Sequence, residues 1–250
     1  MMIVLSIELA EVCGIHAGDG YMRLRGENKG EVDISGSLEE KDYYDNYVVP
    51  LFNKFFDLQL NGRSFSRGSY GFVTYNKNVR DILIGLGFPK GKKSKIVKVP
   101  DLVLNSGDCK VYSAFLRGLF DTDGNLGFRK SYAGVNAFNK NYNHYPVITI
   151  TTVSKCLAEG VIKMLHDMDM IFYYHIRDSR KLNEGRKYLI SISGLDGLDK
   201  WMDMVGSKNP VKLSRYLVWK KFGFCPTNLT LQQRQELLNG KLDPYIIRGL

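Results

Sequence analysis

The feature that most constrains this chain is an internal repeat of a short segment that ends in Asp-Gly. The first copy reads LAEVCGIHAGDGY at residues 9–21, and the second reads SAFLRGLFDTDGN at residues 113–125. When the two are superposed, one alanine, two glycines and one aspartate coincide. A repeat at this spacing predicts two copies of one structural unit.

The segments that follow each copy also repeat. Their hydrophobic patterns predict two strands, a helix, two more strands and a further helix after each motif helix. We therefore expect an α+β fold of two pseudo-symmetric αββαββα units, each with an antiparallel four-stranded sheet. The predicted units span residues 1–88 and 109–250, the second with additional C-terminal helices, and a linker rich in Lys, Pro and Gly covers residues 89–108.

Small residues recur four positions apart within both repeated segments. Residues with this spacing share one helix face, and small side chains there allow two helix backbones to approach closely. A helix-ending role would explain the final glycines, Gly20 and Gly124, as C′ residues, but not the glycines inside each helix. We therefore predict that the two motif helices pack against each other through four small residues: Ala10, Gly14, Ala114 and Gly118.

Each motif helix is predicted to end at an aspartate, Asp19 or Asp123. A carboxylate is disfavoured at the negative end of the helix dipole, by up to about 1 kcal/mol. The same unfavourable placement occurs in both copies, which indicates a function. If the helices run in parallel, the two carboxylates meet at one rim and form an oxygen-rich site that suits Mg²⁺.

The segments VCGIHAGDG and LRGLFDTDG resemble the two motifs of a LAGLIDADG homing endonuclease of the double-motif, monomeric type. The general style of the sequence resembles archaeal intron-encoded members. This resemblance implies a divalent-metal-dependent endonuclease that hydrolyses one phosphodiester per strand of double-stranded DNA at a long, asymmetric site. It also implies that the motif helices join the two halves of an internal pseudo-dimer, whose sheets form a saddle in the major groove.

The resemblance also assigns roles to particular residues. Asp19 and Asp123 match the essential acids that bind Mg²⁺, for which Mn²⁺ can substitute, and the carbonyl groups of Gly18 and Thr122 would assist them. Lys77 matches a basic residue that follows the fourth strand and helps catalysis. The second unit has no lysine at the matching place in SISGLDG, so the two halves need not cut identically.

The chain is basic, with 35 Lys and Arg against 26 Asp and Glu and a formal charge of +9. This charge favours polyanionic partners, because contacts with phosphates release counterions. Basic and aromatic residues on the predicted strands are candidates for DNA contacts. They are Arg23, Arg25, Arg63, Arg67 and Tyr70 in the first unit, and Arg129, Lys130, Tyr132, Arg177, Arg180 and Lys187 in the second.

Two other functions remain open for the same fold. One is an RNA maturase that binds its own intron RNA and assists splicing, and the other is a catalytically inactive DNA-binding regulator. The scattered cysteines and histidines match neither a zinc site nor a disulfide framework. We expect a free-standing cytoplasmic protein without a membrane span.

Overall fold

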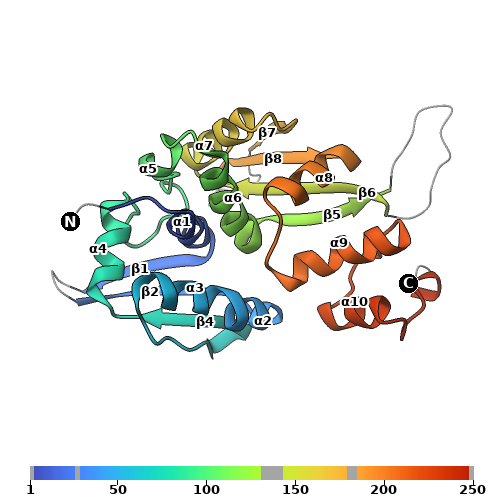
Figure 1. The fold of residues 1–250 in the computed structure, drawn as a ribbon, viewed down its shortest axis with the longest axis horizontal. Coiled ribbons are helices and arrows are strands. Elements are labelled where there is room, and N and C mark those ends of the chain that lie inside the picture. Colours follow the sequence, from blue (N-terminus) through green and yellow to red (C-terminus); the bar gives the residue numbers. More distant parts are fainter. Residues whose placement is uncertain (1–2, 26–28, 131–142, 179–184, 248–250) are drawn as a thin grey trace.

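The computed structural model describes residues 3–25, 29–130, 143–178 and 185–247, which form two similar halves side by side (Figure 1). Each half contains one antiparallel four-stranded sheet. Helix α3 (Val49–Phe56) lies across the first sheet and helix α8 (Leu195–Met204) across the second, while α1 (Ile7–Asp19) and α6 (Cys109–Asp123) lie between the two halves. The predicted α+β architecture with two four-stranded sheets is confirmed.

The first half has the strand order β1-β2-β4-β3. Helices α2 (Lys41–Tyr43) and α3 (Val49–Phe56) are joined by a π-helical turn, η2 (Tyr44–Val48), and a 3-10 turn, η3 (Ser66–Gly68), follows the short strand β3 (Arg63–Ser64). The elements are α1 (Ile7–Asp19), β1 (Gly20–Arg25), β2 (Lys29–Ser37), η1 (Leu38–Glu40), α2 (Lys41–Tyr43), η2 (Tyr44–Val48), α3 (Val49–Phe56), β3 (Arg63–Ser64), η3 (Ser66–Gly68), β4 (Ser69–Thr74) and α4 (Lys77–Gly85).

The second half repeats this order as β5-β6-β8-β7 and continues into three C-terminal helices. The elements are α5 (Asp101–Leu104), α6 (Cys109–Asp123), β5 (Asn125–Arg129), β6 (Tyr145–Thr152), α7 (Lys155–Asp167), β7 (Tyr173–Arg177), β8 (Lys187–Ser193), α8 (Leu195–Met204), α9 (Pro210–Phe222), α10 (Leu231–Leu238) and α11 (Pro244–Ile247).

Helices α1 and α6 pack so closely that their central glycines have no room for a side chain. A Cβ on Gly14 would lie 2.1 Å from the carbonyl oxygen of Phe115, and one on Gly118 would lie 2.5 Å from that of Glu11. Near the end of α1, a Cβ on Gly18 would lie 2.1 Å from Oγ1 of Thr122. The contacts advance in the same direction along both helices, so the helices run in parallel and their C-terminal ends meet.

Gly20 and Gly124, at the ends of the motif helices, do not have the left-handed backbone that is typical of a C′ glycine. Gly20 has φ −79° and Gly124 has φ −77°, which are extended conformations open to any residue. A Cβ on Gly20 would lie 2.1 Å from Nδ1 of His16, and one on Gly124 would lie 2.4 Å from Cδ2 of Phe120. Space, and not a left-handed backbone, therefore requires glycine where each helix turns directly into a strand.

A buried ion pair also joins the two motif helices. The guanidinium of Arg117 on α6 donates from Nη2 to Oε2 of Glu11 on α1 at 2.6 Å, and the hydroxyl of Tyr47 donates to Oε1 of the same carboxylate at 2.8 Å. Both partners of the ion pair are largely shielded from water. Because loss of one partner would leave a buried charge unpaired, this contact ties the two halves together.

Among the residues that the structure describes, no helix has the length and apolar character to cross a membrane.

Candidate metal centre and nucleic-acid interface

Two carboxylates meet where α1 and α6 end. A Cβ on Gly18 would lie 3.5 Å from Cγ of Asp123, which places the second carboxylate against the last turn of the first helix. Asp19 follows Gly18 directly, and the negative charge of Asp123 contributes to its raised pKa. The packing of the motif helices therefore brings together the two acids predicted from the repeat.

The carboxylate of Asp19 is half-buried and hydrogen-bonded. The hydroxyl of Tyr44 donates to Oδ2 of Asp19 at 2.5 Å. Burial raises the pKa of Asp19 to about 7, and the negative charges of Asp123 and Glu40 act in the same direction. The Tyr44 hydrogen bond and the positive charge of Lys212 oppose this rise.

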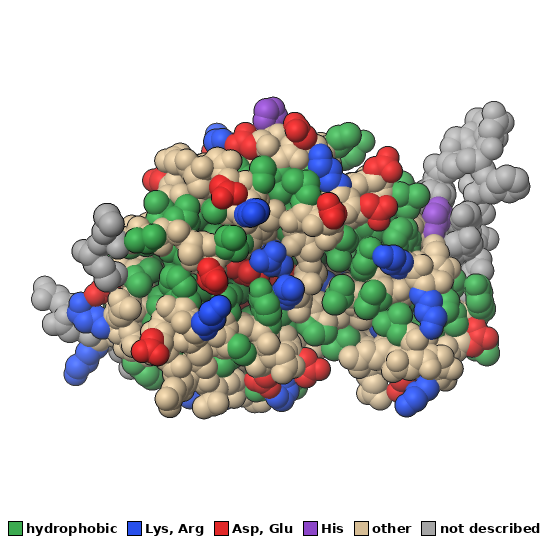
Figure 2. All heavy atoms as spheres, in the orientation of Figure 1, with side chains coloured by type: hydrophobic (Ala, Val, Ile, Leu, Met, Phe, Trp, Pro, Cys, Tyr) green, Lys and Arg blue, Asp and Glu red, His purple; other side chains and the backbone are tan. Residues whose placement is uncertain are grey.

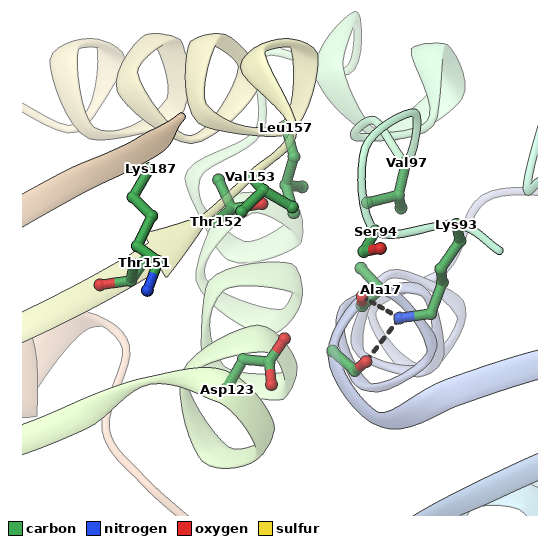
Figure 3. Close-up of a pocket in the computed structure, with 11 residues that line it drawn as sticks. Ala17, Lys93, Ser94, Val97, Asp123, Thr151, Thr152, Val153, Leu157 and Lys187 are labelled. Atoms are coloured by element: carbon green, nitrogen blue, oxygen red, sulfur yellow. Dashed lines mark hydrogen bonds between the residues drawn. The ribbon is translucent and has the colours of Figure 1, made fainter. Parts of the chain in front are cut away.

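The carboxylate of Asp123 is more open. Burial raises its pKa as well, and the nearby ammonium groups of Lys93 and Lys212 counteract part of that effect. Among the described residues, no side chain or backbone group donates a hydrogen bond to it. Asp123 also lines a cavity of about 280 Å³ with Ser94, Thr151, Thr152 and Lys187 (Figure 3).

Two lysines cap the ends of the motif helices. Lys93 donates from Nζ to the carbonyl oxygens of Ala17 and Gly18, both at 2.5 Å, as Figure 3 shows. Burial lowers the pKa of Lys93, while Asp123 and Asp19 favour its charged form. Lys212 on α9 donates to the carbonyl oxygen of Asp121 at 2.6 Å and lies 3.4 Å from that of Thr122.

Neither lysine is marked as a site residue by the sequence patterns. Lys93 lies in the segment predicted to be a linker, and Lys212 lies beyond the predicted repeat. A cluster of four lysines at residues 90–95 is visible in the sequence, but nothing in it marks the one that reaches α1. Their common feature, an ammonium group on the last turn of a motif helix, exists only after the chain has folded.

Lys77, the predicted basic catalytic residue, lies on the surface, and its catalytic role stays a prediction. This residue is the first of α4, its side chain is 66% exposed, and its Nζ lies 2.6 Å from Oδ2 of Asp81 one turn along the same helix. Asn76 caps α4 by accepting from the backbone nitrogens of Asn78 and Val79, so a helix begins just after the fourth strand. The lysine that reaches the last turn of α1 is Lys93.

Asp121 occupies the sixth motif position of the second copy and has a structural environment. Its buried carboxylate accepts from Oγ of Ser207 at 2.5 Å and from the backbone nitrogen of Lys208 at 2.7 Å. Burial raises its pKa to about 6. These contacts fix the chain just before α9 and so help to place Lys212.

The candidate DNA contacts divide into three groups. Arg23, Arg63, Arg129, Lys130 and Arg177 are exposed on or next to strands. Arg25 ends β1, Arg67 lies in η3, and half-buried Lys187 begins β8 and lines the cavity beside Asp123. Tyr132 and Arg180 lie outside the described residues. Figure 2 shows one face of the molecule, on which acidic and basic side chains lie side by side near the centre.

Tyr70 is a correction to the predicted DNA interface. Its side chain is only 6% exposed and belongs to the hydrophobic core. Its hydroxyl donates to Oδ1 of Asp45 at 2.7 Å, and its ring lies edge-on to that of Tyr44. The side chain faces the helices behind the sheet, because strand residues alternate between the two faces and Tyr70 falls on the inner one.

Comparison with known proteins identifies the second half. Residues 110–206 match the family model of the LAGLIDADG-like domain. The matched LAGLIDADG-like segment runs from the start of α6 to the end of α8, so it contains Asp123 and the whole second sheet. A comparison with curated proteins finds no match.

The complete double-LAGLIDADG fold matches solved structures of low sequence identity. The crystal structure of the homing endonuclease I-DmoI in complex with DNA and Mn is 14% identical, with a TM-score of 0.54, over 80% of this chain and 96% of that chain. A lysine-to-alanine variant of I-SmaMI is 12% identical, with a TM-score of 0.57, over 98% of this chain and 97% of that chain. At this identity the likeness establishes the fold, and it extends through the C-terminal helices in the second case.

The donor groups at the centre suit a hard divalent cation. Among the described residues, no three His, Cys, Asp or Glu side chains are arranged as a complete metal site. Two carboxylates from adjacent helix ends are nevertheless the protein ligands that Mg²⁺ commonly uses when substrate phosphates and water complete its coordination. The raised pKa values of Asp19 and Asp123 agree with this, since a cation placed between two repelling carboxylates would favour their charged forms.

Proposed function

We propose that this protein is a site-specific endonuclease that hydrolyses one phosphodiester in each strand of a long, asymmetric double-stranded DNA target. The observation that supports this most directly is the meeting of Asp19 and Asp123 at the ends of two parallel helices, with Lys93 and Lys212 beside them. The double-LAGLIDADG fold supports the same function. One acid and one lysine per half suit a reaction on two strands.

The centre would use Mg²⁺, or Mn²⁺ in its place, held by Asp19 and Asp123 with help from the carbonyl groups of Gly18 and Thr122. A bound divalent ion activates water and stabilises charge on a phosphate. Lys93 and Lys212 keep positive charge at the rim, where it would stabilise the phosphoryl oxygens during attack. Because both ammonium groups are held by backbone carbonyls, they need little rearrangement when DNA binds.

The two sheets would lie along the major groove as a saddle, with the protein acting as a monomer. The units of this internal pseudo-dimer would span residues 1–88 and 109–250, and residues 89–108 would connect them. Along β1 the buried side chain of Met22 alternates with the exposed side chains of Tyr21 and Arg23, so one face of the strand is free to contact DNA. Arginine at the groove suits contacts with phosphates and guanine.

The first experiment incubates the purified protein with a plasmid library that carries intron-insertion junctions from candidate host genes. Reactions with Mg²⁺ and with EDTA are compared, beside a double variant, Asp19→Asn with Asp123→Asn. We expect a linear product that requires Mg²⁺ and both carboxylates. Specific binding of DNA without cleavage under several metals would instead favour a regulator, and specific binding of intron RNA alone would favour a maturase.

A further inference from the structure

The two acids of the centre have different neighbours, although they occupy equivalent positions in the repeat. Asp19 accepts a hydrogen bond from Tyr44, and Gly36 on β2 leaves the space in which this pair meets. A Cβ on Gly36 would lie 2.8 Å from Oδ2 of Asp19, 2.8 Å from Oε2 of Glu40 and 3.0 Å from the Tyr44 hydroxyl. A side chain on this strand would therefore displace the groups that surround Asp19.

The π-helical turn η2 presents Tyr44 to Asp19. Tyr44 is the first residue of this turn and is fully buried, and its neighbour Tyr43 points its own hydroxyl into the core without a hydrogen-bond partner in the described part of the chain. Widened turns of this kind often occur at functional sites because they redirect side chains. The two neighbouring tyrosines thus differ in one respect that can be tested: only one of them reaches the centre.

Glu40 lies beside Asp19 and Tyr44 and is held there by two hydrogen bonds. Its Oε2 accepts from the backbone nitrogen of Ser37 at 3.1 Å, and its Oε1 accepts from Nδ2 of Asn209 at 2.7 Å. Asn209 begins the segment that carries Lys212, whose Nζ lies 3.7 Å from Oε1 of Glu40. Residues from both halves of the molecule therefore hold the side chains around Asp19 in place.

The equivalent helix in the second half provides no such partner. Helix α7 follows β6 as η2 and α3 follow β2, but it is a regular helix from Lys155 to Asp167. The side chains next to Asp123 are those of the cavity, including Thr151 and Thr152 at the end of β6. Among the described residues, Lys93 and Lys212 place positive charge near the Asp123 carboxylate, but none donates a hydrogen bond to it as Tyr44 does to Asp19.

We propose that Tyr44 is a positioning residue that makes the two halves of the cleavage centre unequal, because it orients Asp19 for the metal while Asp123 depends on the metal and the DNA for its orientation. This inference rests on the proposed function. The hydrogen bond from Tyr44 to Oδ2 would hold the Asp19 carboxylate in one orientation, in which it could bind a cation. Loss of an outer hydrogen bond of this type commonly weakens metal affinity by about 10–100-fold.

The test compares Tyr44→Phe with Tyr43→Phe, which removes the same atom from the neighbouring residue. The substrate is the supercoiled plasmid that the endonuclease assay selects, and nicked and linear products are followed over a range of Mg²⁺ concentrations. We expect Tyr44→Phe to need about tenfold more Mg²⁺ for linear product and to accumulate nicked circle at low Mg²⁺. Tyr43→Phe should follow the unsubstituted protein at every concentration.

A second measurement does not depend on activity. Binding of Mn²⁺ to each variant, in complex with a duplex made uncleavable at the mapped positions, is followed by electron paramagnetic resonance of the free ion. We expect about tenfold weaker binding for Tyr44→Phe alone. Recovery of linear product at high Mg²⁺ would show that Tyr44→Phe is folded, because an unfolded variant would give no linear product at any Mg²⁺ concentration.

The outcomes separate the two proposals. If the unsubstituted protein cleaves no DNA with any divalent metal, both the endonuclease function and the role of Tyr44 are overturned. If it cleaves, but Tyr44→Phe and Tyr43→Phe give the same product pattern and the same Mn²⁺ affinity, only the role of Tyr44 is overturned. A loss for Tyr44→Phe that high Mg²⁺ does not restore would also contradict a positioning role.

Discussion

The half of the centre around Asp19 and the half around Asp123 share a helix end, an acid and a lysine on the last helical turn, yet the groups in direct contact with the two acids differ. Asp19 has a tyrosine hydroxyl and a nearby third carboxylate, whereas Asp123 faces a cavity lined by hydroxyl and ammonium groups. The helix ends and the meeting of the two acids follow from the packing of α1 against α6, whereas the two lysines come from residues 89–108 and from α9. The differences arise from segments outside the motif, which shows that pseudo-symmetry in this fold is strict at the helix interface and weak one layer away.

The largest effect should come from removing either acid. We expect Asp19→Asn and Asp123→Asn, each alone, to lower the rate of linear product by about a thousandfold or more at saturating Mg²⁺, because several kcal/mol of charge stabilisation depend on the metal. Asp57→Asn is a matched control, since Asp57 is exposed and its left-handed backbone accepts asparagine. Full activity of either single variant would break the equivalence of the two acids.

The lysines should have the next largest effect. Lys93→Met and Lys212→Met remove the ammonium groups that cap α1 and α6, and we expect each to lower the cleavage rate by about a hundredfold. The expected change is in the rate at saturating DNA, because the ammonium groups would act on charge that develops during attack. If one variant affects the rate and the other only DNA binding, the two lysines have different roles in the two halves.

A matched pair of glycine substitutions, one in α1 and one in α6, tests how closely the two motif helices pack. Gly14→Ala and Gly118→Ala should each destabilise the protein, by about 1–3 kcal/mol, because the added methyl group would collide with backbone across the interface. Gly14→Ala should cost more, since its Cβ would lie closer to the opposing carbonyl oxygen. Urea unfolding measures both values. Gly91→Ala is not a suitable control, because the backbone of Gly91 has φ +76°, which would strain an alanine by itself. A cost near zero for both variants would contradict the packing.

The raised pKa of Asp19 predicts a pH dependence in the metal-free protein. The folded state holds a proton on Asp19 up to about pH 7, whereas the carboxyl group in the unfolded chain loses its proton near pH 4. Between these two values the folded state binds more protons, so this group makes the free energy of unfolding fall as pH rises. The difference between Asp19→Asn and the unsubstituted protein, measured by urea unfolding from pH 4 to 8, should grow across this window and shrink when Mg²⁺ is added.

The smallest effect should come from Lys77. Its exposed ion pair with Asp81 lies on the surface of α4, and such pairs contribute at most about 0.5 kcal/mol. We expect Lys77→Met to change both the free energy of unfolding and the cleavage rate very little, in contrast to Lys93→Met. A large loss of cleavage with unchanged stability would restore the role that the sequence reading expected for Lys77.

The repeated motif predicted the two-unit fold and the two acids from the sequence alone. The coincidence of small residues in both copies was enough to predict closely packed motif helices, because helix periodicity converts a spacing of four into a shared face. The parallel direction of the two helices came from the tertiary structure. The alternating patterns after each motif were enough for the two sheets. These are local rules, and they apply to the sequence directly.

The tertiary structure decided which other residues reach the acids. Lys93 and Lys212 lie at unrelated distances from the motifs along the chain, and Tyr44 reaches Asp19 from the first position of a π-helical turn. Tyr70 and Lys77 looked suitable by residue type, but strand alternation buries the first and a helix cap leads the second to the surface. Periodicity predicts which face of an element a residue occupies, whereas the distance between side chains on different elements depends on how those elements pack.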